Sequence, residues 1–302
     1  MTMKLTSLID TKATISVSTL SDDKELSRDI QKHLVRLGIL DPPADGSFGP
    51  APLFAGRQFL RLMSPDKIPA LDFNLARTLV DAVPEKLLPV EAGRNLAGAI
   101  WKAMEQRKFF LARVPGYLNI IYLEAANLDG TLNANKPNGF NDLRLVLTVQ
   151  GGKPVILGKW EGTTEPGKFY TDNPLNRLGA ARIAFGQYKA WAVGTHGAGA
   201  GAHEALVQCG EIRVHRDLNK DFQRDNDAID TGSSFAVNQH WGYDLPLEDV
   251  GKASAGCLVG RTKEGHKKFM AIVKEDPRYK ANNRYMFMTA VLTSREVQPF
   301  LS

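Results

Sequence analysis

The feature that most constrains the fold is a change in hydrophobic period near residue 111. In residues 25–38 apolar side chains recur every three or four positions, as on one face of a helix. In residues 143–149 every second residue is leucine or valine, as in a strand with one face against a core. We therefore expect an α+β protein, with a small all-helical domain over residues 22–110 and a β-rich, sandwich- or barrel-like domain over residues 111–302.

Composition is consistent with a folded protein and excludes several classes of function. Hydrophobic residues make up 43% of the 302 residues and charged residues 24%, which is ordinary for a chain with a real core. The net charge of +5 is spread along the sequence, so nucleic-acid binding has little support. No run of about 18 apolar residues occurs, so we expect no membrane span. We expect a monomer.

The first third of the sequence reads as a series of short helices. Residues 1 to about 24 are polar and show no helical period. A first amphipathic helix follows and ends at Gly38, a residue suited to a C-cap. The glycine-containing turn at residues 45–50 leads into a second helical stretch near residues 53–62, and further helical periodicity covers residues 72–108.

The remaining two thirds show strand-like runs separated by glycine, asparagine and aspartate. The clearest are residues 118–123, 143–149 and 285–292. Gly151-Gly152 predicts a hairpin turn after the second of these strands. One helix is expected near residues 263–275.

One segment contains the residue types that nucleophilic catalysis by cysteine requires. Cys257 directly follows the small residues Ser254, Ala255 and Gly256, and His240 precedes it by 17 positions. A thiol becomes a nucleophile when a neighbouring base takes its proton, and a glycine turn admits a close approach of substrate. We expect His240 to be the base and the N–H groups of Gly256 and Cys257 to face a developing oxyanion.

This segment resembles the signature of the L,D-transpeptidases, which is a histidine, 14 to 17 residues, and then Ser/Thr-x-Gly-Cys. The four fixed positions correspond to His240, Ser254, Gly256 and Cys257. Residues 163–170 are similar to the Thr-Pro-x-Gly-x-Phe turn of that family. The resemblance implies an acyl-transfer enzyme without a cofactor. It would form a thioester with a peptidoglycan stem peptide, such as a tetrapeptide with diaminopimelate third, and release the terminal D-alanine.

The sequence departs from the family pattern next to both catalytic positions. Trp241 stands between the histidine and Gly242, and Val259 replaces the arginine expected two residues after the cysteine. Arg261 lies two residues further on and is expected to bind a substrate carboxylate instead. These changes favour a divergent branch with a lytic role, as a carboxypeptidase or endopeptidase. We expect the substrate to contact five residues near the active site, namely Trp241, Gly242, Tyr243, Arg261 and His215.

The amino-terminal third resembles the peptidoglycan-binding domain made of three short helices. The likeness lies in residues 30–38 and in the turn at residues 45–50, where Phe48 is expected to pack between the helices. The resemblance implies peptidoglycan, both glycan and stem peptide, as the partner. The first ten residues lack the apolar core of a signal peptide. We therefore expect the protein to reach the periplasm or cell wall through phage lysis, a phage particle or specialised secretion.

Two other functions remain open at this point. The chain can be a non-catalytic wall-binding or structural protein. It can also be a zinc-dependent amidase or peptidase that uses His196, His203 and His215, although these residues lack a compact ligand pattern, and we predict no metal site. Cys209 lies in an apolar run and is expected to pack in the core, and a disulfide between Cys209 and Cys257 would abolish the proposed chemistry.

Overall fold

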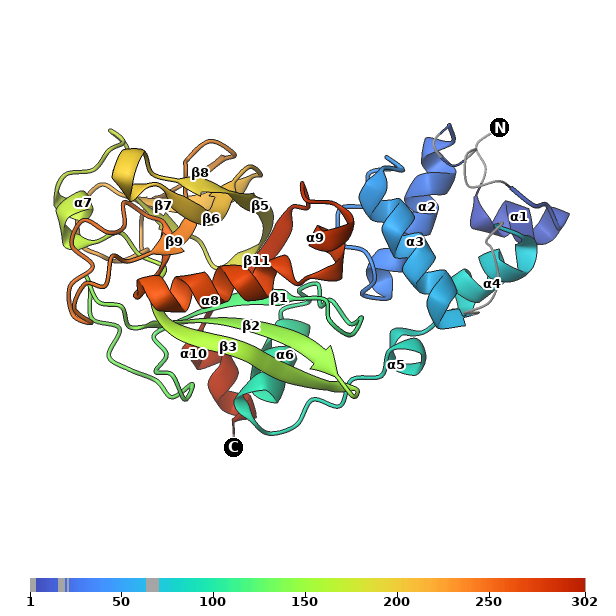
Figure 1. The fold of residues 1–302 in the computed structure, drawn as a ribbon, viewed down its shortest axis with the longest axis horizontal. Helices are drawn as coiled ribbons and strands as arrows, with labels where there is room; N and C mark the ends of the chain where they lie inside the picture. The colour runs from blue at the N-terminus through green and yellow to red at the C-terminus, as the bar shows by residue number, and fades with distance from the viewer. Residues whose placement is uncertain (1–3, 16–19, 21, 64–70, 302) are drawn as a thin grey trace.

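A computed structural model describes residues 4–15, 20, 22–63 and 71–301 of the chain. It has an α+β architecture, with the helices of residues 5–81 at one end and a β-rich body at the other (Figure 1). Before the first strand lie α1 Leu5–Thr11, α2 Lys24–Arg36, α3 Pro50–Met63, α4 Phe73–Asp81, α5 Pro84–Leu87 and α6 Leu96–Gln106. An isolated β-bridge joins Ile15 to Leu71.

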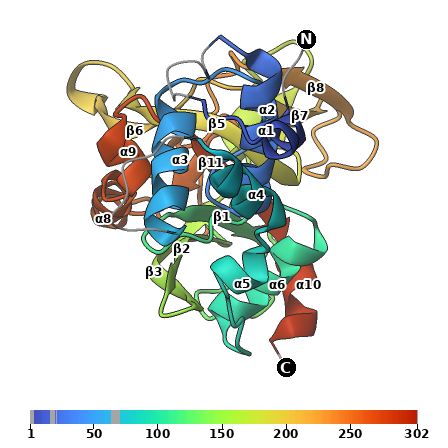
Figure 2. The same ribbon diagram turned by 90° about the vertical axis from the view of Figure 1, so that its right-hand side faces the viewer.

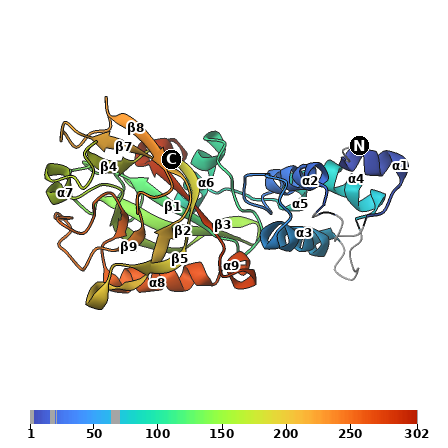
Figure 3. The same cartoon turned by 90° about the horizontal axis from the view of Figure 1, so that it is seen from above.

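The body is an eight-stranded closed barrel with the strand order β1-β11-β5-β6-β9-β10-β3-β2. A separate three-stranded sheet has the order β4-β7-β8 and lies beside the barrel (Figure 3). The strands are β1 Asn119–Glu124, β2 Asp142–Gln150, β3 Lys153–Thr163, β4 Ala180–Ile183, β5 Gly186–His196, β6 His203–Gln208, β7 Ile212–Asp217, β8 Ala228–Gly232, β9 Gln239–Trp241, β10 Leu258–Gly260 and β11 Phe287–Thr293. The helices after β1 are α7 Lys168–Asp172, α8 Lys263–Lys274, α9 Pro277–Ala281 and α10 Ser294–Val297, with 3-10 turns η2 Gly199–Gly201 and η3 Gln298–Phe300.

The predicted β2–β3 hairpin is confirmed. The two strands pair antiparallel, and Gly151 and Gly152 form the turn with φ of 55° and 72°, angles that favour glycine. The alternating side chains of β2 share one buried face, where they pack with α6 and neighbouring strands: Leu143, Leu145, Leu147 and Val149. The helix expected near residues 263–275 is α8, and the expected final strand is β11.

Helix α2 forms as its sequence predicts. The Asp23 carboxylate accepts hydrogen bonds from the N–H groups of Glu25 and Leu26, which satisfies donors that the first turn leaves free. Gly38 adopts a φ of 72° just after the helix, where a side chain would be strained. The Gln31 side chain holds the turn at residues 45–50 by bonding Gly46 and Ser47.

Helix α1 corrects the expectation that residues 1 to about 24 lack a helix. Leu5 and Leu8 are fully buried, and α1 packs against α4. The Leu5 N–H donates to the Asp29 carboxylate at 3.0 Å, so the helix start is satisfied by a residue of α2. Two leucines give little periodicity, and the cap comes from elsewhere in the chain, which is why the local pattern misses this helix.

Helix α6 packs on the barrel rather than on the helices before it. Its buried Ile100 and Trp101 share a core with Ile121 and Leu145 of the barrel. Figure 2 shows α6 beneath the sheet, close to α10. Helices α1–α4 enclose a separate core.

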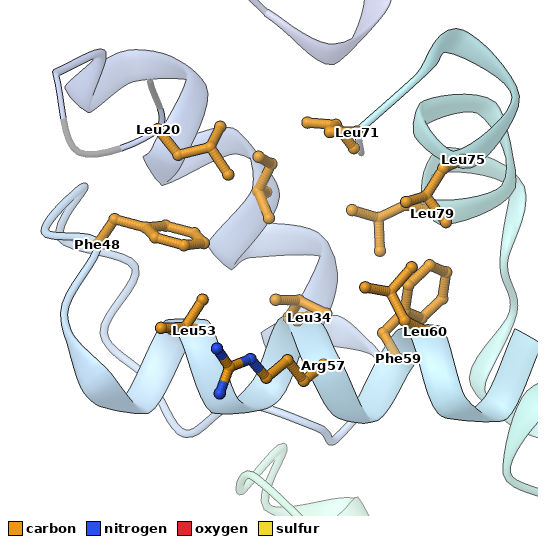
Figure 4. Close-up of a pocket in the computed structure, with 12 residues that line it drawn as sticks. Leu20, Leu34, Phe48, Leu53, Arg57, Phe59, Leu60, Leu71, Leu75 and Leu79 are labelled. Atoms are coloured by element: carbon orange, nitrogen blue, oxygen red, sulfur yellow. The ribbon is translucent and has the colours of Figure 1, made fainter. Parts of the chain in front are cut away.

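A cavity of about 150 Å³ opens among α2, α3 and α4. Its described lining is apolar apart from Arg57, and Phe48 closes one side of it (Figure 4). Phe48 is half-buried against this core, as the turn sequence predicts.

Candidate active site

Cys257 lies directly before barrel strand β10, and His240 lies on the neighbouring strand β9. Strands β9 and β10 are parallel, with Val259 paired to His240. Cys257 packs in one buried cluster with Val259, the residue paired to His240. The register therefore brings together the segments that carry the sequence-predicted nucleophile and base, although 17 positions separate the two residues.

The thiol is buried and contacts backbone groups. Asn238 donates its N–H to Cys257 Sγ at 3.4 Å, and the S–H donates to the Ala236 carbonyl, also at 3.4 Å. Within the described residues these are the hydrogen bonds of the sulfur, and the His240 ring makes none to it. Burial raises the pKa of Cys257 to about 11, and the Asn238 N–H opposes part of that rise. The resting side chain is thus a neutral thiol.

The His240 ring is held as a neutral base. Its Nδ1 lies 2.8 Å from the Trp241 carbonyl oxygen, and because a carbonyl only accepts, Nδ1 carries the proton. The Nε2 atom is left with a free lone pair. Burial lowers the pKa of His240 well below its usual value, and the neighbouring His196 adds to this effect. This tautomer can take a proton from a thiol.

Four histidines, His240 included, gather at this position. His196 stacks on His240 with ring centroids 3.8 Å apart and an interplanar angle of 7°. His203 stacks on Trp241 at 3.6 Å, and its edge faces His266 of α8 at 5.8 Å. In the sequence His196 and His203 flank a small-residue loop, and nothing in that local pattern pairs them with His240.

The turn before the cysteine is built by Ser254 and Gly256. The Ser254 hydroxyl donates to the Cys257 carbonyl at 2.9 Å, and Gly256 donates its N–H to the Ser254 oxygen at 3.1 Å. The Gly256 N–H expected at the oxyanion is thus occupied by the turn itself. Gly256 has a φ of +121°, and a Cβ there would overlap the Ala181 carbonyl oxygen.

The aromatic residues after His240 lie at its edge. Tyr243 is 47% exposed, and its ring centroid is 6.2 Å from that of His240. Trp241 is half-buried beneath Lys263. Gly242 has no room for a side chain, since a Cβ would come within 2.6 Å of the Phe140 ring. An exposed tyrosine beside the candidate base is suited to contact a substrate.

Two of the predicted substrate contacts, Arg261 and His215, have neighbours other than Cys257 and His240. Arg261 Nε donates to Glu161 at 2.5 Å, and its Nη1 donates to the Leu245 carbonyl. His215 lies on β7, opposite Arg182 of β4 in the small sheet. In the described chain no hydrogen bond or ring contact joins His215 to Cys257 or His240.

A buried ionic cluster adjoins the cysteine turn, and of its four members Glu165 alone lies within the motif at residues 163–170. Arg182 pairs with Glu165, and Arg224 pairs with Glu124 through both guanidinium nitrogens. Burial raises the pKa of Glu165 to about 7. A cavity of about 500 Å³ opens beside these four residues. Two positions after Glu165, Gly167 donates its N–H to the Ser254 carbonyl, which links this segment to the turn.

Cys209 differs from its expected position. It is exposed just after β6 rather than packed in the core, because the strand ends at Gln208. Both cysteines are free thiols. Across the described ranges, no three histidine, cysteine, aspartate or glutamate side chains are arranged to hold a metal ion. No helix in those ranges is long and apolar enough to cross a membrane.

Comparison with known proteins yields one distant structural likeness. No family model and no curated protein matches the chain. A crystal structure of a fused Zn-dependent amidase/peptidase/peptidoglycan-binding domain-containing protein from Clostridium acetobutylicum is similar with a TM-score of 0.30 and 12% identity. The match covers 88% of this chain and 94% of that one. A likeness of this size carries no argument about function, so the function proposed below rests on the residues of this chain.

Proposed function

We propose that the protein is a cysteine-nucleophile acyltransferase of the L,D-transpeptidase type that acts on peptidoglycan stem peptides. The observation that carries this proposal is the parallel pairing of β9, which contains His240, with β10, which directly follows Cys257, together with the His240 tautomer set by the Trp241 carbonyl. The signature resemblance of His240, Ser254, Gly256 and Cys257 supplies the substrate class.

The two pKa shifts define how the first step proceeds. A thiol with a pKa of about 11 beside an imidazole with a lowered pKa does not form a resting ion pair. Proton transfer from Sγ to His240 Nε2 therefore accompanies attack on the substrate carbonyl instead of preceding it. The sulfur bonds to the carbonyl carbon, and the Cys257 N–H stabilises the oxyanion.

The second half of the reaction returns the proton. As the peptide C–N bond breaks, the His240 imidazolium gives its proton to the leaving amine, and a thioester to Cys257 remains. An incoming amine forms a cross-link, whereas water gives carboxypeptidase or endopeptidase products. In either case His240 takes a proton from the attacking group, and the thiol is restored. Tyr243 and Trp241 are proposed to contact the substrate, together with Gly242, Arg261 and His215.

We propose that residues 22–110 contain a peptidoglycan-binding-like module in front of a catalytic domain over residues 111–302, with α6 of the first range packed on the barrel. Support comes from the turn at residues 45–50, which Gln31 holds against α2, and from the separate apolar core of α1–α4. Such a module would keep the catalytic domain close to a polymeric substrate.

Digestion of purified sacculi tests this function. Muropeptide mass analysis compares the parent chain with Cys257→Ala and His240→Ala, each with and without EDTA. We expect shortened stems or new cross-links from the parent chain only, with no effect of EDTA. Activity that survives Cys257→Ala would contradict the proposal, and activity lost to EDTA would favour a zinc enzyme. Sacculus binding without any product would favour a non-catalytic wall-binding protein.

A further inference from the structure

The stacked pair of His196 and His240 is the strongest feature of the site that the proposed reaction leaves unused. The rings are nearly parallel, 3.8 Å apart, and come from strands β5 and β9. Parallel contact over the whole ring leaves His240 little freedom to rotate about its side-chain bonds. A base that must present one nitrogen to a thiol depends on that restriction.

Asn238 fixes the His196 ring. The Gln208 N–H donates to Asn238 Oδ1 at 2.9 Å, and because a backbone N–H only donates, the orientation of this amide is determined. Its Nδ2 therefore donates to His196 Nδ1, which lies 2.9 Å away. The lone pair of His196 Nδ1 is engaged, so the proton of the neutral ring is on Nε2. The backbone N–H of Asn238 also donates to Cys257 Sγ.

We infer that His196 is a positioning residue that holds the neutral His240 ring with its Nε2 toward the Cys257 thiol. Asn238 acts as the clamp that joins the stacked ring and the thiol. This inference rests on the proposed cysteine chemistry and adds a residue that the catalytic signature does not contain. His196 transfers no proton. It restricts the His240 ring, which is the group that transfers one.

The charge state of the pair follows from its surroundings. Burial lowers the pKa of both rings. His203 lowers the pKa of His196 further, and His196, His203 and His266 do the same for His240. The ionisable groups that face the pair come from two elements and one loop: His203 of β6, His266 of α8 and Tyr243 after β9. None of these is an anion at neutral pH, so both stacked rings stay uncharged there.

Two substitutions separate the stacked surface from the ring nitrogens. His196→Phe keeps a flat ring against His240 and removes the titratable group, whereas His196→Ala removes both. We expect His196→Ala to lower kcat by about 10- to 100-fold with KM within about twofold, and His196→Phe to stay within about threefold of the parent. Asn238→Ala keeps the backbone N–H at the thiol. We expect its kcat to lie between those of His196→Ala and His196→Phe. His33→Ala, in helix α2, is the control for loss of a distant histidine.

Two measurements do not need a substrate. Nitrogen-15 NMR of labelled histidines reports which ring nitrogen carries the proton, and iodoacetamide alkylation in a Cys209→Ser background reports thiol activation as a function of pH. We expect the Nδ1–H tautomer of His240 in the parent and His196→Phe. In His196→Ala we expect mixed tautomers and an acid limb of alkylation shifted to higher pH. Unfolding midpoints identify any variant that has lost its fold.

The inference is overturned if His196→Ala keeps the parent tautomer and pH profile. It is also overturned if kcat falls as far in His196→Phe as in His196→Ala while His196→Phe remains folded. A parent chain that shows the expected tautomers but releases no muropeptides would contradict the proposed function and leave the inference standing. Muropeptide release that is unaffected by His196→Ala would contradict the inference and leave the proposed function standing.

Discussion

Arg278 of α9 donates to the carboxylate of Asp41 at 2.7 Å, across 237 positions of sequence. Both side chains are buried, and the Tyr285 hydroxyl donates to the second oxygen of Asp41. Asp41 follows α2, so this contact ties the helical end of the molecule to the barrel end. Arg278 is also paired with Asp276 and lies over the Tyr117 ring.

Removing the Asp41 charge should weaken the contact between the two ends of the molecule. Asp41→Asn leaves Arg278 with one carboxylate, and we expect the free energy of unfolding to fall by about 2–3 kcal/mol. Urea unfolding measures this change. Glu25→Gln breaks an exposed pair with Arg28 and is expected to change stability by less than about 0.5 kcal/mol. Equal midpoints for the two variants would refute a structural role for Asp41.

The cysteine turn should tolerate no side chain at Gly256. Gly256→Ala combines a positive φ with a Cβ that would overlap the Ala181 carbonyl oxygen. We therefore expect activity to be lost and the free energy of unfolding to fall by more than about 2 kcal/mol. Gly199 also has a positive φ, but nothing lies within 4 Å of its missing Cβ. Gly199→Ala should therefore lower the free energy of unfolding by only about 1 kcal/mol. Thermal unfolding with muropeptide analysis compares the two, and equal costs would show that the contact with Ala181 is unimportant.

Stability should fall with acid because of His266. This ring donates from Nε2 to the Glu204 carbonyl and accepts from Arg144 at Nδ1. Burial lowers its pKa to about 3, with Arg144 adding to the shift. As pH falls below about 6.5 the unfolded chain binds this proton first, so the stabilisation is complete above pH 6.5 and is lost progressively down to about pH 3.

The matched variant for this pH effect is His266→Gln. Glutamine retains one donor and one acceptor but does not titrate, so the difference in unfolding free energy between parent and variant should shrink between pH 6.5 and pH 3. A tenfold difference in proton affinity between the folded and unfolded chains corresponds to about 1.4 kcal/mol. Urea midpoints at several pH values provide the measurement, and parallel curves for the two proteins would contradict the assignment.

The two thiols should differ in reactivity. Cys209 is exposed, whereas Cys257 is buried with a pKa of about 11. At pH 7.5 we expect iodoacetamide to label Cys257 at less than about one tenth of the rate of Cys209, and the Cys257 rate to rise as pH approaches 11. Peptide mass analysis gives both rates. Denaturant should equalise them, and Cys209→Ser should leave muropeptide release unchanged. Rapid native labelling of Cys257 would instead indicate a resting thiolate.

Elements with a local signal could be predicted from the residues alone. The alternation of residues 143–149 predicted a strand with one buried face, and Gly38 marked the end of helix α2. The cysteine turn and the preceding histidine were also visible, because their residue types and spacing lie in a single stretch of chain. Helix α1 was missed, since its first N–H is satisfied by Asp29 of another helix.

Which side chains meet depends on how the whole chain packs. The register of β9 with β10 brings the segments of Cys257 and His240 together, and the barrel brings His196 onto the His240 ring from a strand 44 positions earlier. The pairing of Arg182 with Glu165 arises in the same way. Periodicity reports which face of a strand is buried, but the order of strands in a closed sheet depends on the packing of the whole core, and that order decides which residues become neighbours.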